Sequence, residues 1–307
     1  MQHSEYSKLV TVAGWAAAGT ATLLITVKLV AWFFTDSASI LASLTDSLMD
    51  VAASVINLIA IKVALTPADD DHKFGHGKAE SLAGLAQAAF ISGSACLLIL
   101  GGLNALIRGT PVQDPGFGIW VMIFSILLTV LLVSFQTMVV KKTGSVAIKA
   151  DSLHYKSDIF MNAAVLMALA LASIGFNWAD GVFAIGVGGY ILYGAWQIGK
   201  ESVDALMDKT LSVDEEAKVV ELAYVDPQVK GVHDLRTRQS GSTKFIQLHL
   251  ELEDKLSLYD AHDVADKLEA RLNNAFIQAD IIIHLDPISV VKPGNRLPRV
   301  DREQLSS

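Results

Sequence analysis

The sequence predicts a polytopic α-helical membrane protein with six transmembrane helices and a small cytoplasmic α+β domain. Three observations support this fold class. Of the 307 residues, 52% are hydrophobic and 18% are charged, and the mean hydropathy is +0.43, so the chain is more apolar than a soluble protein of its size. The apolar residues form long blocks, as a bilayer requires. After the last block, the composition becomes that of a soluble α/β domain.

The six apolar blocks each reach the roughly 20 residues that a helix needs to cross the bilayer core. The first block is too long for the apolar part of a cleavable signal peptide, and further blocks follow at once. Turn-forming residues separate the blocks, for example Thr66-Pro67. The predicted spans are residues 10–34, 38–65, 81–107, 117–140, 146–174 and 178–198.

Basic residues predict the orientation of these spans. One set of flanks carries many lysines, whereas Arg108 is almost the only basic residue on the opposite set. By the positive-inside rule the lysine-rich side is cytoplasmic, so both termini are expected in the cytoplasm. The lysines are Lys8, Lys73, Lys78, Lys141, Lys142, Lys149, Lys200 and Lys209.

Residues 209–290 are expected to form the cytoplasmic domain, after a transmembrane domain of residues 1–208. Ser212 and Glu215 have the spacing of a capping box and predict a helix to about Tyr224. Strands are predicted at 232–239 and 244–253, a helix at 258–276 and a short strand at 280–286. This αββαβ order indicates a metallochaperone-like open sheet with its helices on one face. The polar tail, 291–307, is expected to be disordered.

Charge and cysteine content restrict the partners. The formal net charge is −8, and residues 210–290 contain 15 acidic against 8 basic residues. An acidic cytoplasmic module suits cations and argues against nucleic acid as a partner. Cys96 is the only cysteine and lies in an apolar block, which excludes a disulfide framework and a thiolate metal site. Any metal must therefore be bound by His, Asp and Glu.

Four ionisable residues lie near the middle of two predicted spans. Asp46 and Asp50 are in the second span, and His154 and Asp158 are in the fifth. Each pair is spaced i, i+4, which places both side chains on one helix face. Ionisable groups inside lipid cost several kcal/mol and usually mark a site or pathway. The alternative is a set of polar contacts between helices, but the matched depth of two antiparallel pairs favours a site.

Three carboxylates and one imidazole form an oxygen and nitrogen donor set that suits Zn²⁺, Fe²⁺, Mn²⁺ or Cd²⁺ better than Mg²⁺ or Ca²⁺. Protons and metal would compete for the same lone pairs, so we expect a metal/proton antiporter that works by alternating access. His154 is the natural proton carrier, because imidazole titrates near neutral pH. The alternative is a membrane-anchored metal sensor that signals through its soluble domain. An enzyme is not expected, because no His-Glu-x-x-His helix occurs and a closed four-ligand shell leaves no position for water.

This constellation resembles the cation diffusion facilitator family. The two pairs, on the second and fifth of six spans before an αββαβ domain, match that family, as does the stretch Lys73-Phe74-Gly75-His76-Gly77-Lys78. The nearest branch is that of bacterial ferrous-iron/zinc efflux proteins. The resemblance implies a tetrahedral transport site of Asp46, Asp50, His154 and Asp158. It also implies a homodimer in the bacterial inner membrane that exports metal from the cytoplasm as protons enter.

The loop between the second and third spans contains carboxylates and imidazoles close together. The residues alone leave a metal site and a solvated acidic loop equally open. The resemblance implies that Asp69, His72 and His76 are ligands, with Asp70 as an alternative to Asp69.

The cytoplasmic domain contains four histidines, each of which alone would be a surface residue. Together with Asp286 they favour a binuclear site. The resemblance implies that His233, His249 and Asp286 bind one ion, and that His262, His284 and Asp286 bind the other. Structural zinc there would stabilise the domain or the homodimer. The resemblance also suggests that Lys78 and Asp208 pair near the dimer interface.

Overall fold

The computed structural model describes residues 3–35, 38–108, 118–172, 174, 176, 178–276, 278–291 and 296–298. The chain divides into two compact units. One is Ser7–Val203, and the other is Asp204–Ser307 together with Met1–Tyr6.

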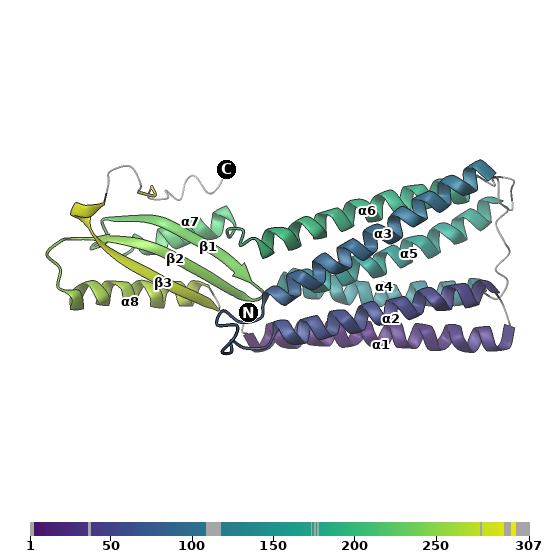
Figure 1. Ribbon diagram of the computed structural model, residues 1–307, viewed down its shortest axis with the longest axis horizontal. Coiled ribbons are helices and arrows are strands. Elements are labelled where there is room, and N and C mark those ends of the chain that lie inside the picture. Colours follow the sequence, from purple (N-terminus) through teal and green to yellow (C-terminus); the bar gives the residue numbers. More distant parts are fainter. Residues whose placement is uncertain are drawn as a thin grey trace. The chain divides into compact units, whose positions relative to one another are not determined.

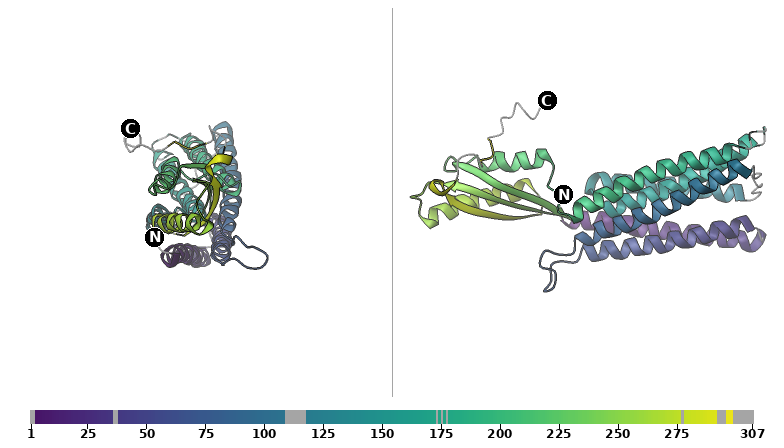
Figure 2. Two further views of the ribbon diagram at one scale, coloured as in Figure 1. Left: turned by 90° about the vertical axis from the view of Figure 1, so that its left-hand side faces the viewer. Right: turned by 45° about the horizontal axis from the view of Figure 1, so that its top comes forward.

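The first unit consists of long helices that run side by side (Figure 1, Figure 2). Four of them, among the described residues, have the length and apolar composition to cross a membrane, namely α1, α3, α4 and α6. The other two, α2 and α5, carry the ionisable residues singled out above, and each has 27 residues, which is about 40 Å of helix. The helices are α1 (His3–Thr35), α2 (Ala38–Ala64), α3 (Lys78–Arg108), α4 (Gly118–Thr143), α5 (Val146–Ala172) and α6 (Ala179–Leu206).

Helix α5 is the central element of this unit. It contacts α2, α3 and α4, and its residues Ala150 and Leu153 share a buried apolar cluster with α3 and α6. Small residues allow the close approach of α3 and α6, where a Cβ on Gly102 would lie 2.8 Å from the Gly181 carbonyl oxygen. Large apolar side chains face outward, for example Trp15 and Trp196. Such an apolar exterior suits contact with lipid.

The second unit confirms the predicted αββαβ order. It contains α7 (Val213–Ala223), β1 (Gly231–Ser240), β2 (Thr243–Leu252), α8 (Leu258–Ala275), β3 (Ala279–Pro287) and a short 3₁₀ turn, η1 (Ile288–Val290). The sheet order is β1-β2-β3, with β1 antiparallel and β3 parallel to β2. Ser212 begins α7 with the predicted capping box: its hydroxyl accepts from the Glu215 backbone N–H, and the Glu215 carboxylate accepts from the Ser212 backbone N–H.

The two faces of this sheet differ because side chains alternate along each strand. Ile246, Leu248 and Leu250 of β2 are buried with residues of both α7 and α8, so both helices cover one face (Figure 2). The opposite face carries His233, His249 and His284, which lie in register on the three strands. The sheet therefore separates an apolar core from a row of imidazoles.

Within the tail that the sequence predicts to be disordered, Arg296–Pro298 have defined contacts. The Leu297 backbone N–H donates to the Val232 carbonyl at 2.8 Å, and the Tyr224 hydroxyl donates to the Leu297 carbonyl at 3.0 Å. Arg296 also contacts a buried carboxylate, that of Glu251. These contacts satisfy polar groups that composition alone cannot assign. Residues 292–295 and 299–307 lie outside the described residues.

Candidate metal centres

The first candidate centre joins α2 and α5 near the middle of both helices. Asp50, His154 and Asp158 each offer a ligand atom, and these atoms lie within 4.8 Å of one another. The Nε2 atom of His154 lies 2.9 Å from Oδ1 of Asp50. His154 is buried, whereas the two aspartates are partly buried. The i, i+4 spacing of His154 and Asp158 thus presents both side chains to the same helix, as predicted.

Asp46 lies on α2, one turn before Asp50. Its side chain is outside the described set, so its part in the predicted four-ligand site stays a prediction. The expected donor set, of carboxylate oxygens and imidazole nitrogen, is otherwise brought together by the described residues. Two or three such donors from separate helices form a partial shell of the kind that divalent transition metals occupy.

Tyr155 fixes the helices around this centre. Its hydroxyl donates to the Ala17 carbonyl of α1 at 3.2 Å and lies 2.8 Å from the Ser54 hydroxyl of α2. Lys28 of α1 donates to the Ser47 hydroxyl of α2 at 2.6 Å. Buried polar groups paired in this way hold α1, α2 and α5 in a defined register.

Asp151, which no sequence pattern singled out, is a fully buried carboxylate one turn before His154. Gln136 of α4 donates to Oδ2 of Asp151 at 2.6 Å, and Gln87 of α3 donates to Oδ1 at 3.3 Å. The same cost argument that indicated Asp50 applies to Asp151 and would have found it. Asp151 links α3, α4 and α5 through two amides, which gives it a structural role beside the first centre.

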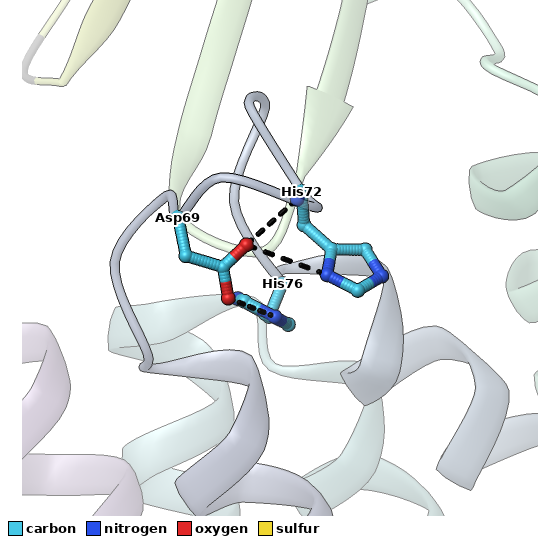
Figure 3. Close-up of side chains that lie close together, drawn as sticks. All are labelled: Asp69, His72 and His76. Atoms are coloured by element: carbon cyan, nitrogen blue, oxygen red, sulfur yellow. Dashed lines mark hydrogen bonds and ion pairs between the residues drawn. The ribbon is translucent and has the colours of Figure 1, made fainter.

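The second candidate centre is the loop between α2 and α3 (Figure 3). The Asp69 carboxylate lies between the two imidazoles, with Oδ1 3.5 Å from His72 Nδ1 and Oδ2 3.4 Å from His76 Nε2. Asp70 instead pairs with Lys73 at 2.6 Å. Of the two carboxylates left open by the sequence, Asp69 is therefore the one placed with the histidines.

Backbone contacts hold Asp69 in this position. The N–H groups of His72 and Asp71 donate to its Oδ1 at 2.7 and 3.0 Å. The hydrogen bond from the His72 backbone lowers the pKa of Asp69 below its usual value. Gly75 has a φ of +77°, a conformation that glycine adopts without strain and that turns the chain back toward α3.

The third candidate centre lies on the open face of the sheet. His233, His249 and Asp286 offer ligand atoms within 4.8 Å of one another. Oδ2 of Asp286 lies 2.7 Å from Nδ1 of His249 and 3.4 Å from Nε2 of His233. Strand register places His233 opposite His249, which brings the two rings to a centroid distance of 5.0 Å. Two imidazoles and one carboxylate form a donor set that fits Zn²⁺.

The expected second ion of this domain is not supported within one chain. His284 lies 3.3 Å from Asp286, but His262 lies on α8 and pairs with Asp266 at 3.5 Å. Because α8 turns Val264 and Leu268 toward the sheet, His262 points away from it, whereas His284 is on the opposite face of the sheet. The periodicity of the sequence placed His262 on a helix and His284 on a strand. It did not show that the two side chains lie on different sides of the sheet.

The expected pair of Lys78 and Asp208 is not tested by the described contacts. Asp208 has Arg238 as an ion-pair partner, with Nη1 and Oδ1 3.2 Å apart. Both residues of that pair belong to the second unit. Its strength is modest because the carboxylate is exposed.

The chain is similar to known cation-efflux proteins over nearly its whole length. Residues 14–207 match the model of the cation efflux transmembrane domain, and residues 211–288 match that of the cation efflux protein cytoplasmic domain. The "Cation-efflux pump FieF" of Escherichia fergusonii is 53% identical over 295 residues, which cover 96% of this chain and 98% of that relative. The pump of the same name from Yersinia enterocolitica is 53% identical over 287 residues, 94% of this chain and 96% of the relative. Both are named as pumps, that is, as transporters and not as enzymes.

A solved structure, "Metal-bound C-terminal domain of CzcD transporter from Thermotoga maritima", is 26% identical to part of the chain. It covers 26% of this chain and 94% of its own, with a TM-score of 0.25.

Proposed function

Because the chain belongs to the cation efflux family, the cation diffusion facilitators, we propose that it exports Zn²⁺ from the cytoplasm in exchange for protons. Fe²⁺, Cd²⁺ and Mn²⁺ are further candidate cargoes, since they accept the same oxygen and nitrogen donors. The transport site consists of Asp46, Asp50, His154 and Asp158. The protein is a homodimer of the bacterial inner membrane with both termini in the cytoplasm, an orientation that the lysine-rich flanks support.

One observation carries the proposal: ligand atoms of Asp50, His154 and Asp158 lie within 4.8 Å of one another, although α2 and α5 supply them from distant parts of the sequence. Ionisable side chains in a membrane helix usually belong to a functional site, because each one raises the free-energy cost of inserting the helix into the bilayer. A sensor that reads metal only through its soluble domain would leave this cluster without a role.

The contact between His154 Nε2 and Asp50 Oδ1, at 2.9 Å, supports the proposed exchange with protons. In the metal-free protein a proton shared by these two atoms satisfies both of them. A bound cation needs the same lone pairs, so it displaces the proton, and a proton arriving from the periplasm displaces the cation. Coupling then requires only that the site face each side of the membrane in turn.

Metal at the other two centres is proposed to serve stability. The Asp69 loop and the cluster of His233, His249 and Asp286 fit Zn²⁺ as a resident ion. The first unit would transport, whereas a cation bound on the sheet adds its binding free energy to the folded cytoplasmic domain or its dimer.

Flux in proteoliposomes tests the proposal. Purified protein is reconstituted with an imposed pH gradient, and zinc uptake is followed with an indicator inside the vesicles. Asp50→Ala and His154→Ala are expected to lose gradient-driven uptake. Ser157→Ala is the matched control, because its hydroxyl donates only to the Leu153 carbonyl of its own helix among the contacts described (2.8 Å).

Equal uptake by wild type, Asp50→Ala and His154→Ala would end the proposal. The same vesicles, supplied in turn with external Zn²⁺, Fe²⁺, Mn²⁺ and Cd²⁺ under one gradient, rank the cargoes by their uptake. Uptake that saturates with metal concentration and depends on the gradient identifies a carrier and excludes a channel.

A further inference from the structure

Glu251 of β2 is a fully buried carboxylate behind the cytoplasmic histidine cluster. It lies opposite Gly231 of β1, and a Cβ on Gly231 would lie 2.5 Å from its carboxyl carbon. Glycine at that position therefore leaves the space that the carboxylate occupies. A buried carboxylate is costly unless charged or hydrogen-bonding partners compensate it. The identity of its partners thus indicates why it is there.

Two residues contact the Glu251 carboxylate from opposite sides. Arg296 donates from Nε to Oε2 at 2.7 Å, and its Nη2 lies 2.6 Å from the same oxygen. The other oxygen, Oε1, lies 3.3 Å from Nδ1 of His233. The Nε2 atom of the same ring lies 3.4 Å from Asp286, inside the candidate metal centre.

Arg296 belongs to a short segment, Arg296–Pro298, here called the tail strap. The strap is held independently of its arginine, because Leu297 bonds through its backbone to Val232 and Tyr224. Val232 precedes His233 on β1. The strap thus contacts the domain next to the metal centre, and it places the Arg296 guanidinium against the Glu251 carboxylate.

Metal-binding histidines usually donate their second ring N–H to a carboxylate, which fixes the ring and directs the free nitrogen to the metal. Glu251 occupies the corresponding place beside His233: Nδ1 lies 3.3 Å from Glu251 Oε1, without a hydrogen bond between them in this structure, and Nε2 faces Asp286. We propose that Glu251 and Arg296 are positioning residues of the cytoplasmic metal centre: Glu251 orients His233, and the tail strap holds Glu251 in place. This inference rests on the proposed metal binding by His233, His249 and Asp286.

Coupling of this kind is reciprocal. If the docked strap strengthens metal binding, bound metal must also strengthen the docking of the strap. The strap is then a part of the chain whose order reports the occupancy of the centre.

Zinc affinity of the full chain in detergent tests the inference. The background variant Asp50→Ala, Asp69→Ala removes the other two centres, and affinity is measured by competition with a chromophoric chelator. Arg296→Gln is expected to weaken zinc binding by at most roughly 10- to 100-fold, the range for loss of the group that contacts a ligand directly, because Arg296 acts on His233 through Glu251. Arg296→Lys retains the charge but not the guanidinium geometry, so it is expected to restore part of the affinity. Lys255→Gln changes the net charge equally at an exposed position and is expected to bind as the background does.

A second variant keeps the test valid if Arg296→Gln does not fold. Glu251→Met with Arg296→Met removes both charges together, so that no buried carboxylate is left without its cation. It is expected to fold, as judged by thermal melting without metal, and to bind zinc as weakly as Arg296→Gln. Affinity equal to or tighter than the background in either folded variant overturns the inference.

Hydrogen exchange gives a readout that a purely structural role would not move. Zinc is expected to slow exchange of the Leu297 amide in the background, and to have no effect there after His233→Ala. Slowing that persists in His233→Ala overturns the coupling. If the background binds no zinc at all, the cytoplasmic centre itself fails, whereas gradient-driven uptake through Asp50 and His154 is judged separately by the vesicle assay.

Discussion

Asp69 owes its position to the backbone of its own loop. Two N–H groups hold one carboxylate oxygen, and both imidazoles lie within 3.5 Å of the side chain. Asp70, the next residue, points to Lys73. A difference of one residue in sequence therefore separates a candidate ligand from a solvated charge.

The pair of neighbouring carboxylates offers a matched test. Asp69→Asn is expected to weaken zinc binding at the loop by roughly tenfold or more, because it removes a charged ligand. Asp70→Asn removes the same charge from an exposed ion pair and is expected to leave zinc affinity unchanged. Titration calorimetry in a background with Asp50→Ala and His233→Ala measures both. Similar losses in the two variants would indicate a diffuse electrostatic effect and no site.

The acid dependence of the loop follows from the lowered pKa of Asp69, which its hydrogen bond from the His72 backbone causes. A lowered folded-state pKa contributes stability that is present above the unfolded value of about 3.9 and is lost as pH falls through the folded value. Loop order, followed by NMR of the His72 amide without metal, should persist at pH 5 and decrease below pH 4. Asp69→Asn should remove that acid transition. A transition at the same pH in the variant would assign it to another group.

At the scale of residues, the sequence predicted the intramembrane ionisable side chains, because placing such groups in lipid is costly. It did not predict which way a side chain points relative to neighbouring elements. Asp50, His154 and Asp158 converge as expected, since i, i+4 spacing fixes a helix face. His262 does not contact His284. Val264 and Leu268 pack in the core against the sheet, and this packing decides which face of α8 is turned toward the sheet. The sequence patterns did not single out Glu251. Glu251 is buried beside Arg296, which belongs to a tail segment. That segment has no periodic pattern from which its position could be predicted.

At the scale of elements, α3 and α6 cross where both carry glycine. A Cβ on Gly102 would lie 2.8 Å from the Gly181 carbonyl and 2.9 Å from the Ala184 Cβ. The next glycine, Gly101, has no atom within 4 Å of an added Cβ among the described residues. Backbone contact at Gly102 cannot yield as a flexible side chain would, so the crossing itself must widen.

Gly102→Ala is accordingly expected to lower stability by about 1–3 kcal/mol, the usual cost of overpacking. Gly101→Ala is the control and should be neutral or slightly stabilising, since alanine favours helix. Thermal unfolding in detergent compares the two variants. Equal melting temperatures would show that α3 and α6 do not approach this closely.

Element boundaries followed from apolar blocks, capping residues and alternation, so the predicted helices and strands lie close to the observed ones. The β-bulge between His233 and Arg236 was not predictable from alternation alone. There Asp234 has a φ of +48°, a conformation that Asp tolerates better than most residues. The bulge adds one residue to β1 and so shifts its alternation. His233 pairs with His249 before the bulge, and Arg236 pairs with Gln247 after it.

For the whole molecule, composition and charge predicted a membrane unit followed by an acidic cytoplasmic unit. The resemblance to cation diffusion facilitators is confirmed by the match of both family domains and by relatives 53% identical over nearly the full chain. The identity of the transported cation depends on free-energy differences between very similar cations, and the spacing of residues does not encode them. The exchange for protons stays a proposal. The proposed dimer likewise requires a surface that one chain does not define.

The central claim is that α2 and α5 jointly bind one divalent cation through oxygen and nitrogen donors. X-ray absorption of the full chain with one equivalent of Zn²⁺, in the variant Asp69→Ala, His233→Ala, tests it most directly. We expect a shell of oxygen and nitrogen at about 2.0–2.2 Å without sulfur, and loss of bound zinc in His154→Ala. Zinc that stays bound with an unchanged shell after His154→Ala, or that binds through the sulfur of Cys96, would contradict it.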